Sequence, residues 1–206
     1  MKTARILRTS PIFKRCVKFS QQLSEKSSYY ATYRKATSGG DVARNHKNSK
    51  LSELIVSAYI SKLHGCLIAP DFNIYEENDK SWVADLPYKD QGFDVFPYNV
   101  HVKSTDNVAL NRVGQKSWVF QLSNASGTGG KDDLFVHPEE HVDDWIAFCY
   151  VNEQEHYVDV SLEWFLPWKD VVDQELLKEP YYNKFKGIKL CVYENDLKEL
   201  DEVRSC

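Results

Sequence analysis

Residues 92–104 read G-F-D-V-F-P-Y-N-V-H-V-K-S, and this stretch decides the fold. Apolar and β-branched residues lie on both sides of a turn at residues 97–98, which predicts a β-hairpin. In that hairpin Asp94 lies opposite His101, and directly opposed residues point to the same face. The period of two adds Lys103 to that face. We therefore predict that an acid, an imidazole and a lysine converge on one side of a sheet.

Upstream of this stretch, the sequence predicts a largely buried helix. Apolar residues recur at helical spacing from Asn48 or Ser49, both good N-caps, to Gly65, a good C-terminal stop. The polar residues form a narrow stripe that includes Glu53 and Ser57. Because a solvated helix face usually carries long charged side chains, the stripe with Glu53 is expected either to line a cleft or to be an ordinary solvated face, and the sequence leaves both open.

The remaining pattern indicates a mixed α/β domain over residues 48–206. Residues 145–151 are almost continuously apolar, as in a strand covered on both faces. The other expected elements are strands at 66–68, 82–86, 117–122, 156–160 and 188–193, and helices at 163–178 and 195–203. Helices on both sides of a sheet follow from this order.

The sequence Asp94 … His101-Val102-Lys103-Ser104 resembles the motif of the PD-(D/E)XK nuclease superfamily, D…(D/E)-x-K. The upstream helix with Glu53 is similar to the first core helix of that superfamily, which often carries an acid. The resemblance implies a restriction-endonuclease-like fold, a central mixed sheet flanked by helices. It also implies a DNA endonuclease that uses Mg²⁺, or Mn²⁺ in its place, to hydrolyse phosphodiester bonds in double-stranded DNA.

The resemblance also implies a role for each residue of the motif. Asp94 and Glu53 would bind the metal together with the carbonyl of Val102. His101 would be a further ligand or would orient the attacking water. Lys103 would stabilise the phosphate charge in the transition state.

Two departures from the family pattern leave alternatives open. His101 stands where an acid is usual, and neutral imidazole is a poor Mg²⁺ ligand beside oxygen donors. The alternative function is therefore a catalytically inactive module of nuclease fold that binds DNA or another protein. Phe93 precedes Asp94 where the family has proline, and Asp85 and Asp90 are alternative first acids.

The net charge of −4 hides two unlike parts of the chain. Residues 1–50 hold twelve Lys and Arg against two acids, and residues 51–206 hold fourteen against twenty-eight. We interpret residues 1–47 as a basic N-terminal arm or helical extension addressed to an anionic partner. The cations expected to contact DNA are Arg44, Lys47, Lys50, Arg112 and Lys116.

Composition restricts the setting in which the protein works. With 42% hydrophobic and 13% aromatic residues, the chain is not of the disordered class. Five dispersed cysteines fit a reducing compartment, and no run of about 18 apolar residues predicts a membrane span. We expect a cytoplasmic protein of a bacterial or phage-infected cell, or a mitochondrial-matrix or nuclear one in a eukaryote. A homodimer would suit cleavage of both strands.

The sequence also contains a pair of closely spaced histidines. His137 and His141 stand four residues apart, a spacing that suits zinc. Because the sequence offers no clear third ligand, we predict an ordinary surface turn there.

Overall fold

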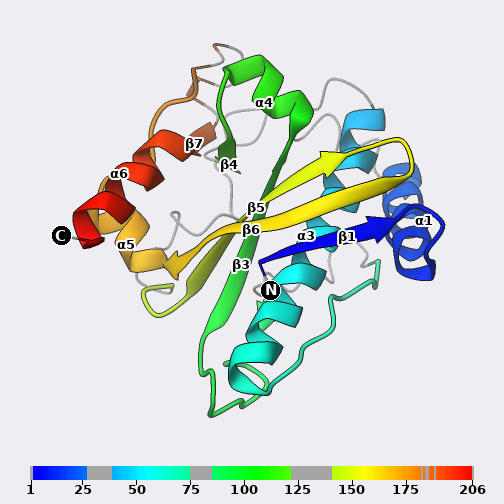
Figure 1. Ribbon diagram of the computed structural model, residues 1–206, viewed down its shortest axis with the longest axis horizontal. Coiled ribbons are helices and arrows are strands. Elements are labelled where there is room, and N and C mark those ends of the chain that lie inside the picture. Colours follow the sequence, from blue (N-terminus) through cyan, green and yellow to red (C-terminus); the bar gives the residue numbers. More distant parts are fainter. Residues whose placement is uncertain are drawn as a thin grey trace.

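A five-stranded mixed sheet forms the middle of the protein, and α/β is therefore the observed class (Figure 1). The computed structural model describes residues 2–26, 39–74, 85–121, 141–181, 183, 186–187 and 189–205. The elements in chain order are β1 (Thr3–Leu7), α1 (Pro11–Lys26), α3 (Gly39–His64), β2 (Leu86–Pro87), β3 (Asn99–Asp106), α4 (Asn107–Val113), β4 (Ser117–Gln121), β5 (Trp145–Glu153), β6 (Tyr157–Pro167), α5 (Trp168–Asp173), β7 (Lys189–Tyr193) and α6 (Glu194–Ser205).

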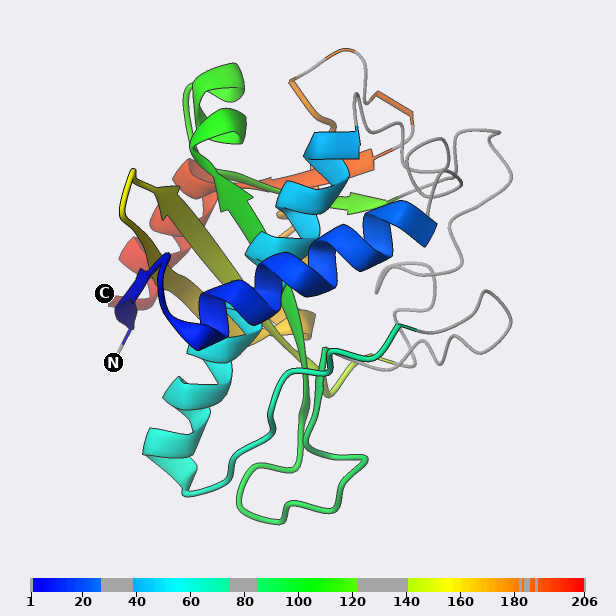
Figure 2. The ribbon, with the colours of Figure 1, turned by 90° about the vertical axis from the view of Figure 1, so that its right-hand side faces the viewer.

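The strand order in the large sheet is β1-β6-β5-β3-β2. Strands β3 and β5 are parallel, and the other neighbouring pairs are antiparallel. A second sheet pairs β4 with β7. Helices α1 and α3 cover one face of the large sheet, with α1 lying across α3 in Figure 2, while β4, β7, α5 and α6 lie toward the other face.

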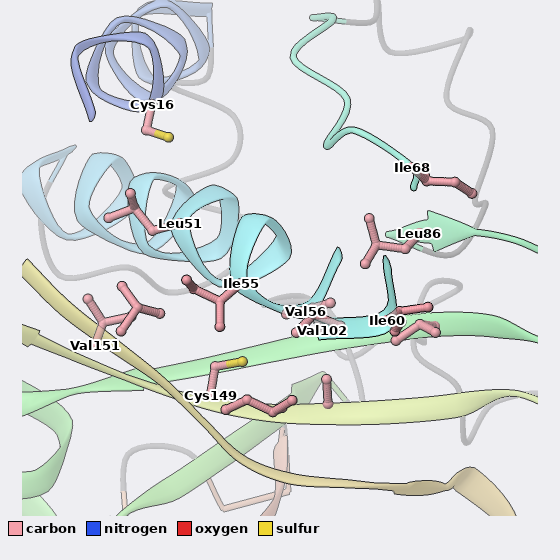
Figure 3. Close-up of a cluster of buried hydrophobic side chains, with 14 of the residues drawn as sticks. Cys16, Leu51, Ile55, Val56, Ile60, Ile68, Leu86, Val102, Cys149 and Val151 are labelled. Atoms are coloured by element: carbon pink, nitrogen blue, oxygen red, sulfur yellow. The ribbon is translucent and has the colours of Figure 1, made fainter. Parts of the chain in front are cut away.

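Strand β5 shows why its sequence is almost continuously apolar. Its Ala147 and Cys149 point into the core under α3, while Ile146 and Phe148 point into a second core formed with β4 and α5. Both faces are buried, so alternation with polar residues disappears. Figure 3 shows the first core, in which side chains of α1 and α3 lie above Val102 and Cys149 of the sheet.

Helix α3 ends as predicted and begins earlier than predicted. Gly65 has a φ of 73°, and its N–H bonds to the carbonyl of Ser61 at 2.9 Å, which is a left-handed glycine stop. The helix begins at Gly39, so the boundary expected after residue 47 falls inside it. The basic N-terminal residues 1–47 also contribute strand β1 to the large sheet and helix α1 to the helical layer.

The predicted hairpin is wrong. Leu86 pairs with Val100 and Pro87 with Asn99, so residues 88–98 form a long loop instead of two paired arms. The rings of Tyr88 and Phe96 meet edge to face inside the core, with centroids 5.5 Å apart. Burial of these aromatic rings outweighs the local pairing that a two-residue turn would allow.

The predicted helix at residues 163–178 is also largely wrong. Strand β6 continues to Pro167, because β5 pairs with it along its whole length and Trp145 faces Pro167. Only Trp168–Asp173 is helical. The predicted strands at 145–151, 156–160 and 188–193 and the final helix are confirmed, while residues 66–68 form no strand.

Candidate functional site

The two faces of β3 carry different chemistry. Val100 and Val102 are buried in the core under α3. Lys103 points to the opposite face, where its Nζ lies 4.7 Å from the ring centroid of Phe120. The predicted alternation along β3 is thus present, and His101 shares the face of Lys103.

Asp85, not Asp94, meets β3. An Oδ2 of Asp85 accepts a hydrogen bond from the backbone N–H of Val102 at 2.7 Å. Asp94 lies exposed in the loop of residues 88–98, so its predicted place opposite His101 is wrong. Asp90 lies exposed in the same loop. Because the N–H and C=O of a residue in a strand point to the same side, the carbonyl of Val102 faces the edge that Asp85 occupies.

Glu53 is buried on the α3 side of the same region, with 1% of its surface exposed. Its carboxylate accepts hydrogen bonds from Lys50 Nζ at 2.7 Å and from Ser49 Oγ at 3.2 Å. Burial raises the pKa of Glu53 to about 8, Lys50 opposes that rise, and the negative charge of Asp85 adds to it. We call Lys50, Glu53 and Asp85 the carboxylate cluster.

On the other face of the sheet, His101, His141 and Asp144 form a second group, here called the His–Asp triad. Asp144 Oδ2 lies 2.9 Å from His101 Nε2 and 2.7 Å from His141 Nδ1. Burial alone would raise the pKa of Asp144, but the hydrogen bonds with both imidazoles outweigh it and hold that pKa below its usual value.

This triad was not predicted from the sequence. Asp144 was not singled out, although it directly precedes the buried strand β5, and parallel pairing places it beside the start of β3. The turn predicted at His141 is present in the described residues, since Asp144 N–H bonds to the carbonyl of His141, but His141 also bonds to the buried carboxylate of Asp144, a third candidate ligand that the prediction lacked. His137 lies outside the described residues.

Four of the five cations expected on DNA are paired within the protein. Arg44 binds Asp106 at 2.9 Å, Lys47 binds Glu153 at 2.6 Å and Lys50 binds Glu53. Lys116 binds Glu163 at 2.6 Å, while Arg112 is exposed. Arg5 and Arg8 of residues 1–47 likewise pair with Asp159 and Glu153. Several of the basic side chains in residues 1–50 therefore form salt bridges with acidic residues of the 51–206 segment.

The two groups suit different ions. Carboxylate and carbonyl oxygens are the ligands of Mg²⁺ and Mn²⁺, which matches Glu53, Asp85 and the carbonyl of Val102. Two imidazoles with one carboxylate suit the later first-row metals. In the described residues, His101, His141 and Asp144 are the group of three whose ligand atoms all lie within 4.8 Å of one another.

Comparisons of the chain with protein-family models, with curated proteins and with solved structures returned no match. Across the described part of the chain, no helix has the length and apolarity needed to cross a membrane.

Proposed function

We propose that this protein is a metal-dependent DNA endonuclease whose site lies at the β2 edge of β3, with Asp85 as the first acid. The observation that carries the proposal is the hydrogen bond from Val102 N–H to Asp85. It fixes a carboxylate beside the strand that bears Lys103, close enough to Glu53 to influence its pKa.

The residues at this edge fit the group that the resemblance implies. Asp85, Glu53 and the carbonyl of Val102 would hold Mg²⁺ or Mn²⁺ through oxygen atoms. A bound cation would replace the Lys50 ammonium as the partner of Glu53. When bound, the ion would supply positive charge against the phosphate. His101 is left out of this set, because its Nε2 bonds to Asp144.

The chain's own residues would carry the other tasks. Lys103 follows Val102 but points to the face opposite Glu53, where its Nζ lies over Phe120, so its long side chain would have to leave that ring and turn round the edge to bring an ammonium to a bound phosphate. Asp85 and Glu53 would keep the nearby backbone and any cation in place. Double-stranded DNA is the proposed substrate, and a homodimer would place two such edges on the two strands.

The test is cleavage of supercoiled plasmid by the full-length chain in Mg²⁺, in Mn²⁺ and in a chelator. We expect metal-dependent nicking that Lys103→Ala reduces by roughly 100-fold or more, the scale for removing one group that stabilises transition-state charge. Lys89→Ala, at an exposed lysine of the neighbouring loop, is the matched control. Absence of cutting with both metals, or equal rates for wild type and Lys103→Ala, would refute the proposal.

One observation favours a second function, a nuclease-fold module that binds DNA or a protein without catalysis. Lys50 already neutralises Glu53, and Arg44, Lys47 and Lys116 are paired with acids of the body. This function predicts salt-sensitive retention of duplex DNA, or capture of a partner protein, with no turnover under any metal.

A further inference from the structure

The His–Asp triad is a separate centre from the proposed nuclease edge. His101 lies near the start of β3, and Asp144 directly precedes β5, the parallel neighbour of that strand. His141 comes from the turn before β5. Neither Glu53 nor Asp85 is hydrogen-bonded to these three side chains in the described interactions.

We propose that His101, His141 and Asp144 bind a divalent first-row transition metal, with Zn²⁺ as the best match. Two imidazole nitrogens and one carboxylate oxygen are a common ligand set for such ions, whereas Mg²⁺ prefers oxygen donors alone. The inference concerns this triad and stands whether or not the β2 edge cleaves DNA.

The three ligand atoms lie within 4.8 Å of one another, close enough to converge on one ion after a small adjustment. Zinc lies about 2.0–2.2 Å from nitrogen and oxygen ligands, so tetrahedral neighbours are about 3.3 Å apart. Asp144 Oδ2 is 2.9 Å and 2.7 Å from the two imidazole nitrogens, which are ordinary hydrogen-bond distances. An ion would replace these hydrogen bonds after each contact opens by about half an ångström, and the proton on each ligating nitrogen would move to the other ring nitrogen or, from an imidazolium, to solvent.

The backbone holds the ligands near this arrangement. The N–H of Asp144 bonds to the carbonyl of His141 at 2.9 Å, and the carbonyl of Asp144 accepts from Trp168 N–H at 2.8 Å. Asp144 is thereby fixed from both sides, and His101 lies on a strand paired with β5. One ligand, His101, thus comes from the sheet itself, and a second, Asp144, is held directly before strand β5.

Exposure of the triad leaves a path for the ion. The Asp144 side chain is 6% exposed, while His101 is 15% and His141 25% exposed. The buried carboxylate lies at the base, and the two imidazoles reach solvent. Three protein ligands leave at least one coordination position for water or a substrate atom, as in catalytic zinc sites.

The test is titration of the full-length, chelator-treated chain with Co²⁺, whose visible absorption reports coordination. We expect one Co²⁺ per chain, displaced by Zn²⁺ and not by an excess of Mg²⁺, without the intense charge-transfer band of a cobalt–thiolate bond. His141→Ala should weaken binding by at least roughly 10-fold, because a lost ligand costs no less than a lost outer-shell partner.

Two controls make the result decisive. His156→Ala removes a histidine that is 82% exposed and remote from the triad, and it should leave the affinity unchanged. His141→Gln, checked by circular dichroism, covers the case in which the alanine variant does not fold. Absence of stoichiometric binding by the wild type would overturn the proposal, and so would a folded His141 variant of unchanged affinity.

Discussion

The carboxylate cluster and the His–Asp triad lie on opposite sides of the same strand, and the pKa of the buried acid is shifted in opposite directions in the two groups. Glu53 is enclosed beneath α3 with one ammonium as its main partner, and burial raises its pKa to about 8. Asp144 is nearly as buried, but two imidazoles hold its pKa below the usual value. Each carboxylate has two hydrogen-bond partners, so their number does not explain the difference: the desolvation of Glu53 and the nearby negative charge of Asp85 raise its pKa, whereas both partners of Asp144 are imidazoles that lower its pKa.

Removing Lys50 should have the largest effect on this contrast. At pH 9, one unit above the Glu53 pKa of about 8, Lys50→Met makes Glu53 keep its proton, so the loss of unfolding free energy should be about 1.4 kcal/mol larger than at pH 5. At pH 5, where Glu53 is protonated, the loss should shrink to about 1 kcal/mol, the value of a neutral hydrogen bond. Urea denaturation at both pH values measures this, with Lys62→Met on the exposed side of α3 as control. Equal losses at the two pH values would contradict the account.

Replacing Glu53 should remove a pH dependence from the metal-free protein. Because the folded pKa is raised, the folded state keeps a proton that the unfolded chain releases, so stability falls as pH rises from about 4.5 to about 8. Glu53→Gln cannot lose that proton, and its free energy of unfolding should be flatter across this window. Denaturation in the presence of a chelator compares the two chains, and parallel slopes would show that Glu53 is ionised throughout.

Asp144 should give the opposite and smaller dependence. Its pKa is lowered in the folded state, so its stabilising contribution is present above the usual value of 3.8 and is lost as pH falls through and below it. Asp144→Asn should therefore lose stability at neutral pH and show a shallower decline in acid than the wild type. Thermal melts between pH 3 and pH 7 measure the stability at neutral pH and its decline in acid. If Asp144→Asn and the wild type lose stability equally steeply in acid, the lowered pKa of Asp144 is contradicted.

Local patterns were sufficient for several elements of the fold. The end of α3 follows from Gly65, and the two-sided burial of β5 follows from its apolar run. The common face of His101 and Lys103 needed only the period of two along β3. These features depend on neighbouring residues, so the sequence could predict them.

Features set by distant contacts could not be predicted in this way. The choice of Asp85 over Asp94 depends on the length of the loop at residues 88–98, which Tyr88 and Phe96 anchor in the core. The His–Asp triad joins residues more than forty positions apart, and it requires the parallel pairing of β3 with β5. The salt bridges of the basic residues could not be predicted either, since net charge does not show which acidic residues they pair with in the folded protein.

The most direct measurement is the single-turnover rate of plasmid nicking in Mn²⁺ by wild type, Asp85→Asn and Asp94→Asn. The account predicts that Asp85→Asn cuts at least roughly 100-fold more slowly, because it removes a carboxylate at the proposed metal edge, while Asp94→Asn cuts at the wild-type rate. A loss confined to Asp94→Asn, or wild-type cutting by Asp85→Asn, would contradict the placement of the site beside Val102.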